Sequence, residues 1–314
     1  MKNRILLDMG TTNTRIALYC GTERKALEKL KVGAGTSVSE GKDYLFSTVR
    51  AAILEILEAN NLTETDLTGI YASGMAGSEL GLMDAPRCAL PASISDLKKN
   101  GVTKVLPALS CVPCTVLPGI ESADRSDLST FDVARGEETE LYGILDAMNV
   151  QTPVALILPG THNKLIVVDE NKNITKVQTF ISGEMIAAVS GYTILKSSVT
   201  LEDTFDKEAL LQGAKQEEMD GLAGALFKVR LSGQLDPNTP NLFKSSFLQG
   251  AVLSGDARQI AKHARGASLL IGGKAILRDA LAVLLKELYG MDSATVPDDI
   301  VEESTFRGIL SIID

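Results

Sequence analysis

Residues 5–19 read ILLDMGTTNTRIALY, and this stretch guides the interpretation of the rest of the chain. The apolar run Ile5–Leu7 predicts a buried strand, and residues 15–19 predict a second strand that returns beside it. Asp8 ends the first strand and Gly10 opens a polar turn. An acidic residue at a strand end can hold Mg²⁺ through water, and such a turn leaves backbone N–H groups for phosphate oxygens. We expect Asp8 to bind metal. The residues expected to contact phosphate are Gly10, Thr11, Thr12 and Asn13.

A similar arrangement recurs near the middle of the chain. Val154–Leu158 predicts a buried strand, and residues 165–168 predict its return strand. The turn between them reads PGTHNK and contains Gly160 and Thr161, which we expect to form a second phosphate contact. Two similar hairpins in one chain indicate a duplicated architecture with a cleft between two lobes.

A third element combines a strand, two glycines and a helix. Residues 267–271 predict a buried strand that ends at Gly272 and Gly273, and residues 276–288 predict the helix. Lys274 follows, but Ala275 and the absence of an upstream glycine exclude a P-loop. Because backbone N–H groups are free at a helix N-terminus, we expect Gly272 and Gly273 to contact a nucleotide.

Strands and helices alternate along the chain, which predicts a mixed α/β fold. Residues 137–148 predict a helix, and the tract that follows it is the best candidate for a domain boundary. We therefore divide the chain into an N-terminal lobe, 1–148, with the first hairpin and a ligand-facing loop, and a C-terminal lobe, 149–314, with the second hairpin and the double glycine.

Composition excludes several classes of protein. The 314 residues include 31 basic and 40 acidic side chains, a net charge of −9, which argues against a dedicated nucleic-acid binder. Neither a signal peptide nor a membrane-spanning run is evident, so we expect a cytoplasmic protein without a membrane partner. A homodimer is left open. Cys111 and Cys114 form a C-x-x-C motif, but His162 and His263 are the only histidines, which favours packed thiols over a redox pair or zinc site.

The combination of two hairpins with a strand–glycine–helix element resembles the sugar kinase and actin superfamily. Within it, the chain is similar to the 2-dehydro-3-deoxygalactonokinase family over nearly its whole length. The segments that carry the resemblance are residues 7–15 (LDMGTTNTR), 74–78 (GMAGS), 135–139 (RGEET), 159–164 (PGTHNK), 182–184 (SGE) and 247–250 (FLQG).

The resemblance implies a two-lobed, ribonuclease H-like (actin-like ATPase) α/β fold with ATP in the cleft between the lobes. It also implies transfer of the γ-phosphoryl group of ATP, with Mg²⁺, to the 6-hydroxyl of 2-dehydro-3-deoxy-D-galactonate, a small-molecule sugar acid. Two alternatives stay open: a kinase for another such acid, for example the gluconate-derived one, and a non-catalytic ATP-binding regulator of the same superfamily.

The superfamily places its catalytic carboxylate at the start of the helix that joins the lobes, where this chain has Arg135-Gly-Glu137-Glu138. By position against the Asp-Thr pair of hexokinases, Glu138 is the favoured base, Glu137 is the alternative, and Arg135 assists. Both glutamates also suit a purely structural role, because carboxylates in a first turn complement the helix dipole.

An acidic acceptor requires a cation beside its carboxylate, and Arg135 and Lys164 are the candidates. The loop after residue 74 is expected to form a wall of the sugar site, although Glu79 and Leu82 replace the asparagine and aromatic residue common in the family. His162 is expected to orient a phosphate oxygen or a substrate hydroxyl, and a histidine that only caps the turn is the alternative. The remaining candidates for substrate contact are Met75, Ala76, Gly77, Ser78 and Glu184.

Overall fold

The computed structural model describes residues 2–122, 124 and 126–314. The chain forms two units. Unit 1 comprises residues 1–150, 170–177 and 299–314, and unit 2 comprises residues 151–169 and 178–298. Unit 1 thus includes the C-terminal segment 299–314 together with the N-terminal half of the chain.

Unit 1 is built on a six-stranded sheet with the order β3-β2-β1-β4-β7-β6, in which β3 is Glu23–Leu30, β7 is Pro113–Val116 and β6 is Val102–Val105. β1 (Asn3–Met9) lies inside it, antiparallel to β2 (Thr14–Cys20) and parallel to β4 (Leu67–Gly74). Side chains alternate between the two faces of a strand, so Ile5, Leu7 and Met9 share one face and Asp8 lies on the other. All of Ile5–Leu7 is fully buried, as predicted.

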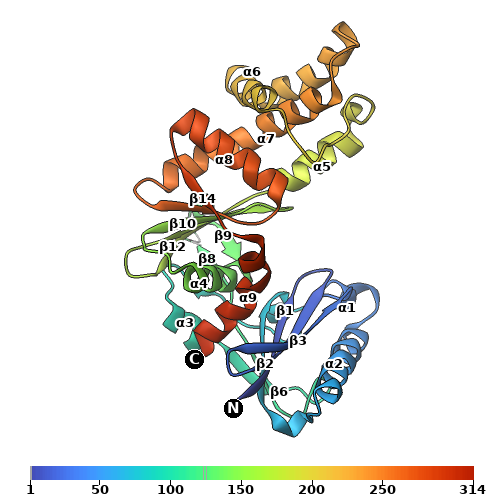
Figure 1. Ribbon diagram of the computed structural model, residues 1–314, viewed down its shortest axis with the longest axis vertical. Coiled ribbons are helices and arrows are strands. Elements are labelled where there is room, and N and C mark those ends of the chain that lie inside the picture. Colours follow the sequence, from blue (N-terminus) through green and yellow to red (C-terminus); the bar gives the residue numbers. More distant parts are fainter. Residues whose placement is uncertain (1, 123, 125) are drawn as a thin grey trace. The chain divides into compact units, whose positions relative to one another are not determined.

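α2 (Lys42–Ala59) covers the face of this sheet that carries Ile5 and Leu7 (Figure 1). Its buried residues recur at helical spacing, which produces one apolar stripe toward the strands. The side chains of this stripe are Leu45, Val49, Ala52, Ile53, Ile56 and Leu57.

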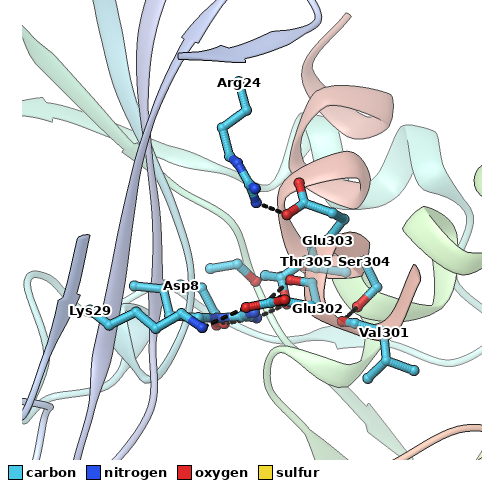
Figure 2. Close-up of polar contacts among 11 residues, drawn as sticks. Asp8, Arg24, Lys29, Val301, Glu302, Glu303, Ser304 and Thr305 are labelled. Carbon is cyan, nitrogen blue, oxygen red and sulfur yellow. Dashed lines mark hydrogen bonds and ion pairs between the residues drawn. The ribbon is translucent and has the colours of Figure 1, made fainter. Parts of the chain in front are cut away.

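α9 (Asp298–Ile313) lies on the opposite face of the sheet (Figure 1). Figure 2 shows Glu302 and Glu303 of this helix directed at Lys29 and Arg24, with which they form ion pairs. Its end is held by Arg4, which pairs with both carboxylate oxygens of Asp314 at 2.9 and 2.5 Å.

α9 also crosses α4 (Glu137–Met148) at very close range. A Cβ on Gly143 would overlap the carbonyl oxygen of Ser304, and a Cβ on Gly308 would overlap that of Thr139. Glycine on each helix lets the two backbones touch, and this packing explains why the C-terminal segment belongs to unit 1.

A five-stranded sheet has the order β12-β11-β10-β13-β14, and all of its strands except β12 lie wholly in unit 2. β10 (Val154–Leu158) is antiparallel to β11 (Asn163–Val168) and parallel to β13 (Ser268–Ile271). This is the relation that β1 has to β2 and β4, so the duplicated plan expected from the two hairpins is present in the sheets. The outer strands are β12 (Ile174–Phe180) and β14 (Ser293–Thr295).

Helices complete the core of unit 2. α6 (Lys207–Leu235) and α7 (Asn241–His263) pack closely at Gly213 and Gly250, where a Cβ on either residue would overlap a carbonyl oxygen of the other helix. α8 (Ala275–Tyr289) buries Leu277, Leu281 and Leu284 in the same core as Ile157 and Ile271.

The remaining elements are mostly short. They are β3 (Glu23–Leu30), α1 (Thr36–Ser39), β5 (Cys88–Ala89), α3 (Ile94–Lys99), β6 (Val102–Val105), β7 (Pro113–Val116), β8 (Ile120–Ser122), β9 (Asp132–Ala134) and α5 (Ser182–Tyr192), with single helical turns at Glu64–Asp66, Met75–Gly77, Leu128–Thr130 and Ile194–Ser197. Strands β5, β8 and β9 form a three-stranded sheet of their own.

Candidate active site

The first hairpin tip, in unit 1, is held by its carbonyl groups. Gly10 donates its N–H to the carbonyl of Asn13 at 2.8 Å, while the carbonyls of Gly10 and Thr11 accept from Ala34 and Gly35 at 3.0 and 2.8 Å. Residues 11–13 are exposed. Fixed carbonyls on one side and an exposed turn on the other suit the tip for the predicted contact with phosphate oxygens.

Asp8 lies next to this tip, paired with Arg15. The Nε of Arg15 donates to Oδ2 of Asp8 at 2.8 Å, and its Nη1 donates to the carbonyl of Glu302 at 2.6 Å. The guanidinium also lies 5.2 Å from the ring centre of Phe306. Arg15 therefore fixes one oxygen of Asp8, while the other, Oδ1, lies beside Gly74.

The start of α4 gathers the carboxylates proposed for catalysis. Glu137 accepts the N–H of Arg135 at 2.9 Å. Both oxygens of Glu138 accept the N–H of Gly136, at 2.9 and 2.8 Å, and Thr139 donates to it at 3.3 Å. The two glutamates thus contact the backbone at the beginning of their helix, which is the structural role that the sequence left open.

Glu138 has a further property that a surface capping residue lacks. It is 1% exposed, and burial, with the charge of Glu137, raises its pKa to about 7. Hydrogen bonds from Gly136 and Thr139 only partly offset this effect. A carboxyl group with a pKa near neutrality can exchange a proton at the working pH of an enzyme.

Glu140 is a residue that the sequence interpretation missed. Burial, together with the charges of Asp8 and Glu137, raises its pKa to about 8. A third acidic residue in the first turn was visible in the sequence, but its proximity to Asp8 follows only from packing of α4 against the sheet. The first unit therefore brings Glu140 close enough to Asp8 and Glu137 for their charges to act on it.

Arg135 is engaged with the loop that follows β4. Its Nη1 donates to the carbonyl of Gly77 and its Nη2 to that of Ala85 at 3.1 Å. Burial lowers the pKa of this guanidinium. Met75 is half-buried, and Ala76 and Gly77 are buried, so the two hydrogen bonds of Arg135 fix the loop that is expected to form a wall of the sugar site.

The second hairpin tip, in unit 2, is set by a buried network. Gly160 donates its N–H to Oδ1 of Asn163 at 2.9 Å, and Nδ2 of Asn163 donates to Asp256 of α7 at 2.7 Å. The other oxygen of Asp256 accepts from Ser182 at 2.7 Å. Asp256 is 3% exposed, and burial raises its pKa to about 6 against the effect of these two hydrogen bonds.

The other candidates in this tip differ in exposure and in their contacts. Thr161 is exposed, and its carbonyl accepts the N–H of Glu184 at 2.9 Å. The side chains of His162 and Glu184 meet at 2.9 Å between Nε2 and Oε2. Lys164 is buried, and its Nζ donates to Thr179 at 2.6 Å.

The double glycine lies directly beside this tip. Gly273 has a φ of +70°, and a Cβ there would overlap the carbonyl oxygen of Pro159, which also accepts the N–H of Lys274 at 2.9 Å. The tip and the start of α8 form a cavity of about 300 Å³. It is lined by Gly160, Thr161, Gly183, Glu184, Ile186, Ala187, Leu201, Glu202, Asp203, Gln249, Lys274, Ile276 and Leu277.

The C-x-x-C motif at Cys111 and Cys114 lies outside the two hairpin tips and the start of α4. Cys111 is exposed and Cys114 is buried in β7, and both are free thiols. Burial raises the pKa of Cys114 to about 12, which disfavours the thiolate that redox or metal chemistry needs. Across residues 2–122, 124 and 126–314, no group of three or more His, Cys, Asp or Glu has a metal-binding arrangement. No helix in that part of the chain is long and apolar enough to cross a membrane.

Comparison with known proteins finds one family and several similar proteins that are described by the same activity. The family described as 2-keto-3-deoxy-galactonokinase matches residues 8–312. The 2-dehydro-3-deoxygalactonokinase of Escherichia coli (strain K12) is 26% identical over 309 residues, covering 97% of this chain and 96% of its own. A Rhizobium meliloti (strain 1021) protein assigned the same activity is 30% identical over 136 residues, 43% of this chain and 42% of its own. A solved structure from Sinorhizobium meliloti, assigned likewise, has a TM-score of 0.80 at 21% identity and covers 98% of this chain and 97% of that one.

The duplicated sheets confirm the two-lobed, ribonuclease H-like (actin-like ATPase) α/β fold class expected from the sequence, and the family match defines the chain as a kinase. The match over residues 8–312 specifies the family. The chain belongs to the 2-keto-3-deoxy-galactonokinase family.

Proposed function

We propose that the protein transfers the γ-phosphoryl group of ATP to the 6-hydroxyl of 2-dehydro-3-deoxy-D-galactonate, giving the 6-phosphate and ADP. The observation that carries this proposal is the family match over residues 8–312, joined to the buried carboxyl group of Glu138 with a pKa of about 7. Glu138 is the proposed general base for the acceptor hydroxyl. Phosphoryl transfer otherwise requires positioning and charge neutralisation, which hairpin tips and cations provide.

The proposed contacts are assigned within each unit separately. In unit 1, Gly10, Thr11, Thr12 and Asn13 are proposed to contact phosphate oxygens, and the loop from Met75 to Ser78 is proposed to contact the sugar acid. In unit 2, Gly160 and Thr161 are proposed to hold the γ-phosphoryl group, with the nucleoside near Gly272 and Gly273. His162, Glu184 and Lys164 are proposed substrate contacts.

The residues around Asp8 fit a bound Mg²⁺ ion. Arg15 bonds to Oδ2 of Asp8, and Oδ1 has no hydrogen-bond partner among the residues that the structure describes. One carboxylate oxygen suits an ion that keeps most of its ligands as water and phosphate oxygens. When bound, Mg²⁺ supplies charge neutralisation for the phosphates of ATP. The role of Arg15 is to hold the Asp8 carboxylate in one orientation.

Changing Asp8 to asparagine should weaken Mg²⁺-dependent turnover, because the amide removes the charge that attracts the ion. A titration of Mg²⁺ at saturating ATP measures this as a higher metal concentration for half-maximal rate. Asp43→Asn, at an exposed position in the first turn of α2, is the matched control and should leave the titration unchanged. A wild-type titration curve for Asp8→Asn would remove Asp8 from the metal site.

Changing Arg135 to leucine should raise KM for the sugar acid far more than KM for ATP. The reason is that the loop at Gly77 and Ala85 loses the two donors that position it. Steady-state kinetics with each substrate varied in turn gives both constants, and exposed Arg265→Leu is the control. Equal increases in both constants would assign Arg135 a general structural role.

The substrate itself is tested by ADP release, measured across a panel of sugar acids with Mg²⁺ and ATP. We expect the highest kcat/KM with 2-dehydro-3-deoxy-D-galactonate. A higher value with the gluconate-derived epimer would establish the alternative kinase, and ATP binding without turnover on any acid would establish a non-catalytic regulator.

A further inference from the structure

The start of α5 packs directly against the second hairpin tip. Glu184 donates its N–H to the carbonyl of Thr161 at 2.9 Å, and a Cβ on Gly183 would overlap the carbonyl oxygen of Gly160. The N–H groups of Thr161 and His162, by contrast, donate to no group within the part of the chain that the structure describes. A tip that places its carbonyls against a neighbour and keeps N–H groups free suits the acceptor oxygens of a phosphoryl group.

The first hairpin tip has a supporting segment of the same kind, residues 33–35. This segment donates two backbone N–H groups to the carbonyls of Gly10 and Thr11, at 3.0 and 2.8 Å. The hairpin is tied to it directly, because the fully buried Thr14 donates its hydroxyl to the carbonyl of Val32 at 2.7 Å. Each unit thus holds its tip against a second segment, and in unit 1 a side chain of the hairpin itself joins the two.

In unit 2 the tip and its supporting segment, residues 182–184, are joined by Asp256 of α7. One carboxylate oxygen accepts from Nδ2 of Asn163 at the end of the tip, and the other accepts from Oγ of Ser182, both at 2.7 Å. The three side chains are 3%, 1% and 5% exposed for Asp256, Asn163 and Ser182. A carboxylate accepts at both oxygens, so one buried side chain holds both donors.

Asp256 also determines the direction of the Asn163 amide. Oδ1 of Asn163 accepts the N–H of Gly160 at 2.9 Å, so the amide must present its NH₂ group on the opposite side. An ionised carboxylate offers acceptors only, and it therefore favours this orientation over the flipped one. Removing the carboxylate leaves two buried donors unpaired and releases the amide that fixes Gly160.

We propose that Asp256 is a positioning residue for phosphoryl transfer, because it joins the second hairpin tip to the start of α5 in the conformation that receives the γ-phosphoryl group. The proposal rests on the proposed function, in which Gly160 and Thr161 contact that group. Asp256 acts through Asn163 and Ser182. Its loss should therefore weaken the binding of nucleotides that carry a γ-phosphate and spare those that lack one.

The test compares ADP with the non-hydrolysable β,γ-imido analogue of ATP. Each is titrated with Mg²⁺ into the full-length protein by isothermal titration calorimetry at about pH 8, where a carboxyl group with a pKa of about 6 is ionised. We expect Asp256→Ala to weaken binding of the analogue at least ~10-fold while changing that of ADP less than ~2-fold. Asp256→Asn can accept from Asn163 and donate to Ser182, so it should keep the wild-type ratio of the two affinities.

Ser254→Ala is the matched control. Ser254 is a buried polar residue of the same helix, 2% exposed, and its hydroxyl bonds to Glu217 and to the carbonyl of Ala251 instead of to the tip. This variant should bind both nucleotides with the wild-type ratio. An equal change of the ratio in Ser254→Ala and Asp256→Ala would assign the effect to general loss of packing in α7 and overturn the inference.

Two further results would overturn it. Asp256→Ala protein that binds both nucleotides like wild type, or that loses both to the same extent, contradicts a positioning role at the γ-phosphoryl group. If Asp256→Ala fails to fold, Ser182→Ala removes only one of the two hydrogen bonds and should still weaken the analogue selectively, so a wild-type ratio there is equally decisive. Failure of the wild-type protein to bind either nucleotide would overturn the proposed kinase function as well, whereas unchanged ratios in the variants overturn only the role of Asp256.

Discussion

Replacing Glu138 by glutamine should lower kcat at least ~100-fold while leaving the affinity for ATP intact, since general acid–base groups typically contribute ~10²–10⁴-fold in rate. The amide keeps the size of the side chain and one acceptor for the N–H of Gly136, so the start of α4 is preserved. It cannot take a proton from the acceptor hydroxyl.

The pH profile provides the sharper measurement. Glu138 must be ionised to act as a base, and burial raises its pKa to about 7. Wild-type kcat/KM should therefore fall as the pH decreases through about 7, and this acidic limb should be absent from the residual activity of Glu138→Gln. The charges that face this group are Glu137, which raises the pKa, and Arg135, whose own pKa Glu138 raises.

Glu137→Gln separates the two neighbouring candidates. If it abolishes turnover while Glu138→Gln stays active, the base is Glu137 and Glu138 is a capping residue. Glu55→Gln, at an exposed position of α2, controls for loss of a glutamate elsewhere and should have wild-type kinetics.

The second large effect is expected at the crossing of α4 and α9. Gly143→Ala and Gly308→Ala each place a methyl group against a backbone carbonyl, of Ser304 and Thr139 respectively. Backbone cannot move aside as a side-chain end can, so each substitution should destabilise the protein by at least ~1–3 kcal/mol. Thermal unfolding followed by circular dichroism measures the loss.

The chain offers a control of the same chemistry. Gly255 lies within α7, and a Cβ there meets nothing within 4 Å. Gly255→Ala should be neutral or stabilising by up to ~1 kcal/mol, because alanine is the better helix former. If Gly143→Ala has the same unfolding temperature as the wild-type protein, the two helices can move apart without loss of stability and their close packing is not required.

Most of the helices and strands that contain the candidate site residues were predicted from the sequence. α4 and β10 have the predicted bounds, and the strand at residues 15–19 lies within β2. These segments have strong apolar periodicity bounded by glycine, asparagine or proline, so local information was sufficient. β3 was not predicted, because its sequence ERKALEKL is polar and mostly exposed at the sheet edge and has no strand alternation.

Contacts between residues far apart in the chain could not be predicted from the sequence. Asn163 and Asp256 are 93 positions apart, and nothing in the intervening residues marks them as partners. The placement of α9 beside α4 likewise depends on glycines at two remote positions that fit together only in three dimensions. The roles proposed for individual residues in catalysis and binding remain predictions for the experiments above.

Three carboxyl groups retain their protons in the folded chain to a higher pH than they would after unfolding. Their pKa values are about 7 for Glu138, about 8 for Glu140 and about 6 for Asp256, against ordinary values of 4.5, 4.5 and 3.8. Folding therefore takes up protons between roughly pH 4 and pH 8, and the contribution of these groups to stability falls as the pH rises through that window. Acidification thus increases the stabilising contribution of these three groups, while it reduces the ionised form of Glu138 that the proposed reaction requires. These three carboxyl groups therefore stabilise the folded chain most at a pH too low for Glu138 to act as the proposed base.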